Sequence, residues 1–104
     1  MADHAENVKK YVADADDKKI AAIVKYCGIA LQKRDSSLVS CSDKDELATV
    51  RNGFSKKKLG LTDDAAIDAA LKKVCETMKA DKSKARVTFY YLLAKETGTL
   101  GKLG

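Results

Sequence analysis

Chemistry in this chain would have to come from few side chains, because its 104 residues include one histidine and three cysteines. His4 lies near the first residue, where little surrounding structure would hold it for general acid–base catalysis. Cys27, Cys41 and Cys75 are 14 and 34 residues apart, unlike the close Cys or His pairs that bind structural zinc. The sequence therefore predicts no metal site, no cofactor and no catalytic residues, and we expect a protein that is not an enzyme.

Cys41 is the candidate for a reactive thiol. It lies in a polar loop just before an expected helix, and the positive end of a helix dipole favours the thiolate. Cys27 and Cys75 lie on apolar helical stripes and are predicted to be small core residues. An odd number of widely spaced cysteines argues against a disulfide framework and favours a reducing compartment. Because Cys41 has no neighbouring histidine or resolving cysteine, a structural role is favoured over a redox or nucleophilic one.

Basic residues suggest a second kind of activity. Residues 1–46 hold eight Lys/Arg against nine Asp/Glu, whereas residues 47–104 hold twelve against six. The stretch "GFSKKKLG" does not have the glycine spacing of a phosphate-binding loop. A dispersed basic surface that associates weakly with nucleic acid, in a salt-sensitive way, is the alternative function. Its candidate residues are Lys56, Lys57, Lys58, Lys79, Lys82, Lys84 and Arg86.

The elements that would position these residues are helices. Apolar residues recur at the helical period throughout the chain, and the sequence contains no proline. The fold class predicted is all-α, a compact single-domain bundle of four to five helices. The domain spans residues 1–104, with 1–3 and 99–104 frayed. The expected helices lie near 4–13, 17–32, 43–59, 63–79 and 84–97.

Residue types also predict where the helices begin. Asp43 is expected to cap the third helix, with Glu46 in the position that completes a capping box. Thr62 is the expected N-cap of the fourth helix, and Ser83 or Asp81 that of the fifth.

The stretch "VRNGFSKKKLG" is open to two interpretations. Asn52-Gly53 is a strong hairpin signal, but the apolar residues around it follow the helical period and favour a helix in which Gly53 is a weak point. In that helix Lys57 shares the face of Phe54, so its stem should cover the core. Gly60 is expected to end the helix in the left-handed conformation.

The run "VTFYYLL" at 87–93 could be a buried strand, but the chain offers it hardly any partner strand, so a helix is favoured. Such a helix would be central in the bundle or lie at a subunit interface. Phe89, Tyr90 and Tyr91 are therefore the candidate interface residues. The leading function is a non-enzymatic protein-interaction or assembly module, with a protein partner or self-association as a homodimer.

Other partners and locations are disfavoured by composition. No apolar run approaches the ~20 residues that span a bilayer, and the first residues lack a secretory signal. We therefore expect a cytoplasmic protein without membrane attachment, and the residues imply no small-molecule ligand.

The acidic "SDKDEL" followed by "F-x-x-K-K-L-G-L" resembles a family of small bacterial proteins known as a domain of unknown function. The similarity extends from about Lys9 to Gly98, through "IDAALKKVC" and "ARVTFYYLLAKETG". It implies a mostly helical, intracellular bacterial protein and brings no established activity or catalytic residues. At Gly53 the family pattern usually has a larger polar residue, so the chain departs from it there.

Overall fold

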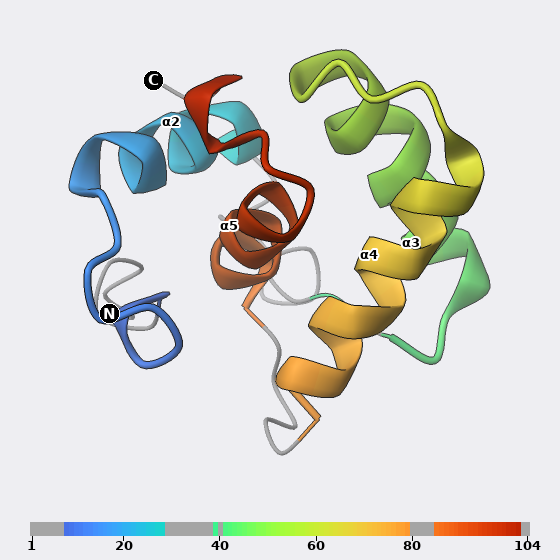
Figure 1. Ribbon diagram of the computed structural model, residues 1–104, viewed down its shortest axis with the longest axis horizontal. Helices are drawn as coiled ribbons and strands as arrows, with labels where there is room; N and C mark the ends of the chain where they lie inside the picture. Colours follow the sequence, from blue (N-terminus) through green and yellow to red (C-terminus); the bar gives the residue numbers. More distant parts are fainter. Residues whose placement is uncertain (1–7, 29–38, 40, 80–84, 103–104) are drawn as a thin grey trace.

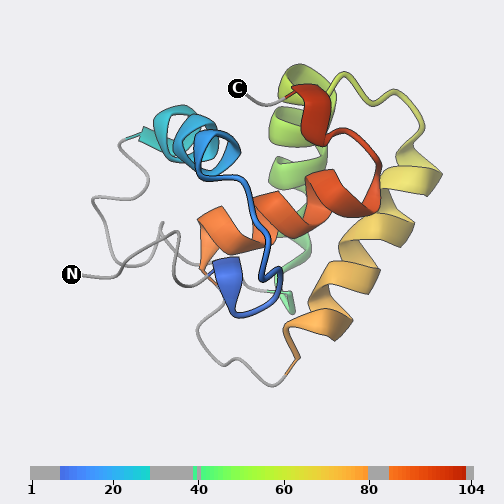
Figure 2. The same cartoon turned by 60° about the vertical axis from the view of Figure 1, so that its left-hand side comes forward.

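Helix α5, Arg86–Glu96, runs through the middle of the molecule and is flanked by the other helices (Figures 1 and 2). The computed structural model describes residues 8–28, 39, 41–79 and 85–102. Helix α2, Asp17–Cys27, packs against one side of α5, and α4, Asp64–Thr77, packs against another. The predicted all-α bundle is confirmed.

Burial of α5 on every side explains its sequence. Nine consecutive residues, 86–94, are buried, whereas a surface helix buries a single stripe. A helix enclosed all round has no polar face, so its sequence reads as a continuous apolar run like that of a buried strand. The choice of helix for "VTFYYLL" is confirmed.

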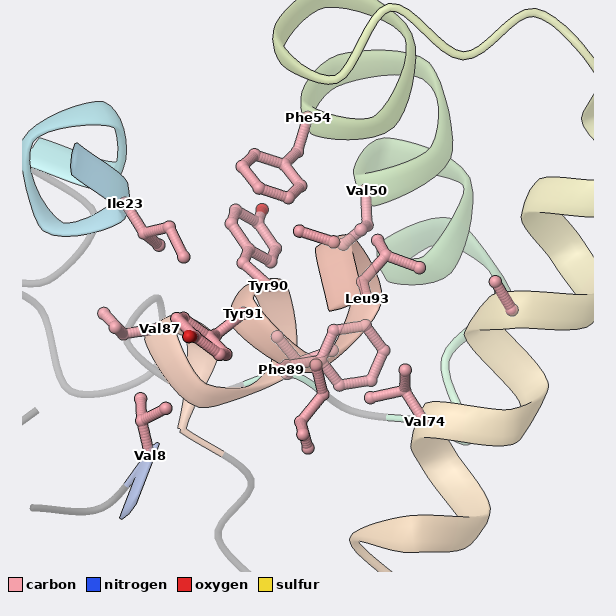
Figure 3. Close-up of a cluster of buried hydrophobic side chains, with 14 of the residues drawn as sticks. Val8, Ile23, Val50, Phe54, Val74, Val87, Phe89, Tyr90, Tyr91 and Leu93 are labelled. Atoms are coloured by element: carbon pink, nitrogen blue, oxygen red, sulfur yellow. The ribbon is translucent and has the colours of Figure 1, made fainter. Parts of the chain in front are cut away.

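The three aromatic residues of α5 point to three different parts of the molecule (Figure 3). The Phe89 side chain points towards α4. Tyr90 stacks on Phe54, with ring centroids 4.1 Å apart. The Tyr91 hydroxyl accepts a hydrogen bond from the backbone N–H of Asp16 (3.0 Å). All three are at most 5% exposed, so their assignment to a subunit interface is wrong: they form the centre of the bundle.

Helix α2 begins at an aspartate and ends at a glycine. Asp16 caps it by accepting from the backbone N–H of Lys18 (2.9 Å), and Ile20 and Ile23 bury its inner face. Gly28 follows with a positive φ of 48°, which glycine adopts without strain. The helix predicted over 17–32 therefore stops at Cys27, and 29–32 lie outside the described residues. Of the helix predicted near 4–13, residues 4–7 also lie outside, residues 8 and 9 are helical, and the chain then turns, with the N–H groups of residues 11 and 12 donating to the carbonyl of residue 8 (both 3.0 Å).

The helix predicted over 43–59 forms in two parts. Asp43 caps α3, Lys44–Val50, as predicted, by accepting from the backbone N–H groups of Asp45 and Glu46. The Glu46 side chain instead pairs with Arg86 of α5. From Arg51 to Lys58 the chain continues as a π-helix, η2. Asn52-Gly53 therefore lies inside a helix, as expected, and does not form a hairpin.

The π-helix changes which side chains face the core. Its hydrogen bonds run i→i+5, so each turn takes roughly four to five residues. Phe54, Ser55 and Leu59 are buried as a result, while Lys57 is exposed, and the expected placement of Lys57 over the core is wrong. Gly60 follows with φ 70°, as predicted for the residue that ends the helix.

The last two long helices begin differently from expectation. Asp63, not Thr62, caps α4 by accepting from the N–H groups of Ala65 and Ala66. Ala85 is the N-cap of α5 and makes no side-chain capping bond. Ser83 and Asp81, the predicted caps, lie outside the described residues. Beyond α5 the chain forms a 3₁₀ turn, η3, Leu100–Lys102.

Candidate functional site

A groove lies between the first two-thirds of α4 and the C-terminal end of α5. The connection from η2 forms one wall, and the cavity volume is about 550 Å³, within the range of ligand and side-chain binding pockets. Much of its lining is small and apolar. The lining residues are Gly60, Leu61, Thr62, Asp63, Ala66, Ile67, Ala69, Ala70, Lys73, Glu96 and Thr97.

The helical period of α4 produces the groove floor. Ala66, Ala69, Ala70 and Lys73 are spaced by three, one and three residues, so they share one face of the helix. Alanine side chains end at Cβ and leave space between α4 and α5 that larger residues would fill. The sequence signal for this site is the alanine-rich stretch 65–70, for which only a helix near 63–79 was predicted.

Charged groups form the rim of the groove. Lys73 Nζ lies 3.1 Å from Glu96 Oε1, and this ion pair joins α4 to the end of α5. The Lys73 side chain is 66% exposed, so such a pair adds little stability. Asp63 lies at the other end of the groove and caps α4. The groove therefore combines an apolar floor with a polar rim.

Close to the groove, α4 is also held to η2 by charge pairs. Lys56 Nζ lies 2.7 Å from Asp64 Oδ1, and Arg51 lies 3.2 Å from Asp68. The hydrogen bond from Lys56, supported by the charges of Lys56 and Arg51, holds the pKa of Asp64 below its usual value. These contacts keep the start of α4 against η2.

The residues predicted to bind nucleic acid do not form one surface. Lys56 is paired with Asp64, while Lys57 is exposed and Lys58 half-buried at the end of η2. Lys79 is exposed just after the other end of α4. Lys82 and Lys84 lie outside the described residues.

Arg86 is wrong as a nucleic-acid contact, because it is buried and fully engaged inside the protein. Its guanidinium pairs with Glu46 of α3 and donates to the Tyr90 hydroxyl (2.9 Å). Burial alone would lower the pKa of Arg86, but Tyr90 and Glu46 together raise it above its usual range. The group therefore stays charged and joins α3 to α5.

The cysteines differ most from expectation. Cys41 is bonded to Cys75 in a disulfide, with Cα atoms 5.9 Å apart, so the free reactive thiol predicted at Cys41 is wrong. The chain reverses between α3 and α4, which brings the residues before α3 beside the end of α4. Spacing along the chain does not reveal this pairing, because the two cysteines are 34 residues apart and meet only in the folded structure. Disulfides are typical of oxidising compartments, and the cysteine pattern no longer favours a reducing one.

Three further expectations from the sequence concern His4, metal binding and membrane attachment. His4 lies outside the described residues. Within the described ranges, no group of three or more His, Cys, Asp or Glu residues could hold a metal ion. None of the described helices is long and apolar enough to cross a membrane.

The fold and the groove define a small all-α bundle with a candidate docking site on its surface. The chain belongs to the family described as protein of unknown function (DUF2853), which matches residues 3–101. The resemblance to a domain-of-unknown-function family is thereby confirmed. No curated protein matches the chain.

Proposed function

We propose that this protein is a non-enzymatic protein-interaction module whose α4–α5 groove receives an apolar side chain of a protein partner. The observation that carries the proposal is the groove itself: a hollow of about 550 Å³ with an alanine floor and a charged rim. Protein interfaces commonly combine an apolar centre with a polar rim. Much of the binding free energy comes from a few large side chains that fill pockets on the partner.

The surroundings support docking over chemistry. The charged groups of the rim are already engaged within the protein. Lys73 and Glu96 neutralise each other, and Asp63 caps α4. These groups can orient a partner through hydrogen bonds without acting on a bound substrate. The aromatic residues expected to form an interface are internal, so the groove replaces them as the surface proposed for a partner.

Filling the groove tests the proposal. Ala69 is exposed and lines the groove, so Ala69→Trp should occupy the space without disturbing the core. Ala65→Trp, on the same helix but outside the lining, is the matched control. Each variant is used as bait in nuclease-treated lysate of the native host, and its self-association is measured by sedimentation.

A partner or dimer that wild type and Ala65→Trp retain, and that Ala69→Trp loses, is the expected result. Capture or self-association that is equal in all three proteins would contradict docking in the groove. Circular dichroism of each variant establishes that the bundle is intact, so that lost binding reports on the groove.

A further inference from the structure

A second surface, formed by η2 and by the part of α2 that follows its first residue, Asp17, carries mainly positive charge. Residues 18–28 include three lysines and no Asp or Glu, and residues 51–58 include four basic residues and again no acid. Both segments lie along the same side of α5 (Figures 1 and 2). Tyr26 of α2 joins them, with its ring centroid 5.4 Å from that of Phe54 in η2. We call this region the Tyr26 surface.

The charges of this surface are only partly neutralised. The two basic residues of η2 that face α4 are paired, Arg51 with Asp68 and Lys56 with Asp64. The other lysines form no ion pair with any residue of the described ranges. They are Lys18, Lys19, Lys25, Lys57 and Lys58.

Tyr26 provides an aromatic ring that is open to solvent. It is 42% exposed, and within the described part of the chain no other large hydrophobic residue is exposed. Phe54 lies beneath it at an interplanar angle of 54°, and Phe54 in turn stacks on Tyr90. The ring is therefore held from below by two buried aromatic residues.

The Tyr26 side chain packs beside η2 at Gly53. The Tyr26 hydroxyl lies 3.8 Å from the position that a Cβ of Gly53 would occupy, so the tyrosine lies close to the backbone of η2.

Lysines flank the ring in both directions. Lys19 precedes Tyr26 by seven residues, which places it on the same face of α2, about 10 Å away along the axis. Lys57 and Lys58 follow Gly53 by four and five residues, which is one turn of a π-helix. They therefore lie on the side of η2 that Tyr26 contacts. The result is a strip in which an aromatic ring is bordered by cations at both ends.

We propose that the Tyr26 surface binds single-stranded nucleic acid, with an unpaired base stacked on Tyr26 and the neighbouring phosphates held by Lys19, Lys57 and Lys58. Exposed aromatic rings interleaved with cations are the arrangement by which proteins bind single strands without sequence preference. A duplex buries the faces of its bases, so it could bind this surface only through the contacts of its phosphates with the lysines. An acidic protein would likewise gain nothing from stacking. The proposal is independent of the α4–α5 groove.

Fluorescence anisotropy with a labelled single-stranded oligonucleotide of mixed sequence tests this proposal. Tyr26→Ala should weaken binding about tenfold or more, as expected for the loss of one stacked base, while Tyr26→Phe keeps the ring and should bind like wild type. Lys57→Gln/Lys58→Gln leaves Tyr26 in place. It should weaken binding and reduce the slope of log affinity against log salt by about 1.4, since each single-strand phosphate contact contributes about 0.7.

Controls separate stacking from charge. Lys79→Gln removes an exposed lysine at the far end of α4 and should leave affinity unchanged. The same oligonucleotide annealed to its complement should bind more weakly than the single strand and should be insensitive to Tyr26→Ala. Circular dichroism shows whether each variant is folded. Equal affinity for the two forms, or a folded Tyr26→Ala that binds like wild type, would overturn the proposal, as would tighter binding to an acidic polypeptide.

Discussion

Removing the disulfide between Cys41 and Cys75 is expected to lower the free energy of unfolding by about 4 kcal/mol. The bond closes a loop with a sequence separation of 34 residues. The chain-entropy relation for a loop of that length gives about 4 kcal/mol at room temperature, because the unfolded chain loses conformational freedom when it is cross-linked. A domain of ordinary stability has about 5–15 kcal/mol in total, so the loss would be large.

The structure also indicates where the effect should appear first. Two cross-links tie the first turn of α3 and the residues before it to the rest of the molecule: the disulfide to α4, and the ion pair of Glu46 with Arg86 of α5. Without the disulfide, the first turn of α3 is held at Glu46, and the packing of Val50 holds only the other end of the helix. We therefore expect faster hydrogen exchange in α3 than in α5 once the bond is removed.

The assay is urea unfolding followed by far-ultraviolet circular dichroism. Oxidised wild type, wild type reduced with a small dithiol, and Cys41→Ser/Cys75→Ser are compared. The reduced protein and the double variant should unfold at similar urea concentrations, well below oxidised wild type, and dithiol should not affect the double variant. If oxidised and reduced wild type unfold together, or if Cys41 and Cys75 both react with a thiol reagent in unreduced, denatured protein, the reasoning is refuted.

Two ion pairs give the remaining predictions. Glu46→Ala should cost about 3 kcal/mol in urea unfolding, because it leaves the buried guanidinium of Arg86 without its carboxylate; Glu46→Met/Arg86→Met, which removes both charges, should recover most of this loss, and failure to recover would contradict the explanation. At the surface, the pKa of Asp64 is held below its unfolded value by Lys56, so the stability that this carboxylate contributes is present above about pH 4. It should be lost as the pH falls through the lower, folded pKa, and Lys56→Met should raise that pKa in an NMR titration; an unchanged carboxyl titration would exclude the pairing.

Sequence periodicity predicted most of the fold because local apolar patterns determine which helix faces are buried. The Asp43 cap and the end of η2 at Gly60 follow from residues close in sequence, whereas the helical state of 87–93 was inferred from the lack of a partner strand elsewhere in the chain. Where a predicted helix start is wrong, two adjacent residues are both able to cap the helix. Thr62 and Asp63 can both cap a helix, and the structure uses the aspartate.

The candidate sites were less predictable because they depend on contacts between segments that are distant in sequence. Cys41 meets Cys75, and Arg86 meets Glu46 40 residues away. A buried arginine and an exposed one cannot be told apart in a sequence. In the same way, the sequence does not show which lysines of the predicted basic surface are paired with acidic residues. The switch from α to π geometry at Arg51 also changes which lysines face solvent, and no simple residue pattern signals it.

The central position of α5 has a consequence for how the chain reaches this structure during synthesis. Helices α2, α3 and α4 all precede α5 in the chain, yet their apolar faces pack on it or on residues joined to it. The contact of Asp16 with Tyr91 alone spans 75 residues. The earlier helices therefore leave the ribosome with exposed apolar faces and cannot complete a core until residue 96 has emerged. During that interval the nascent chain is vulnerable to aggregation, and the bundle cannot fold before α5 has been synthesised.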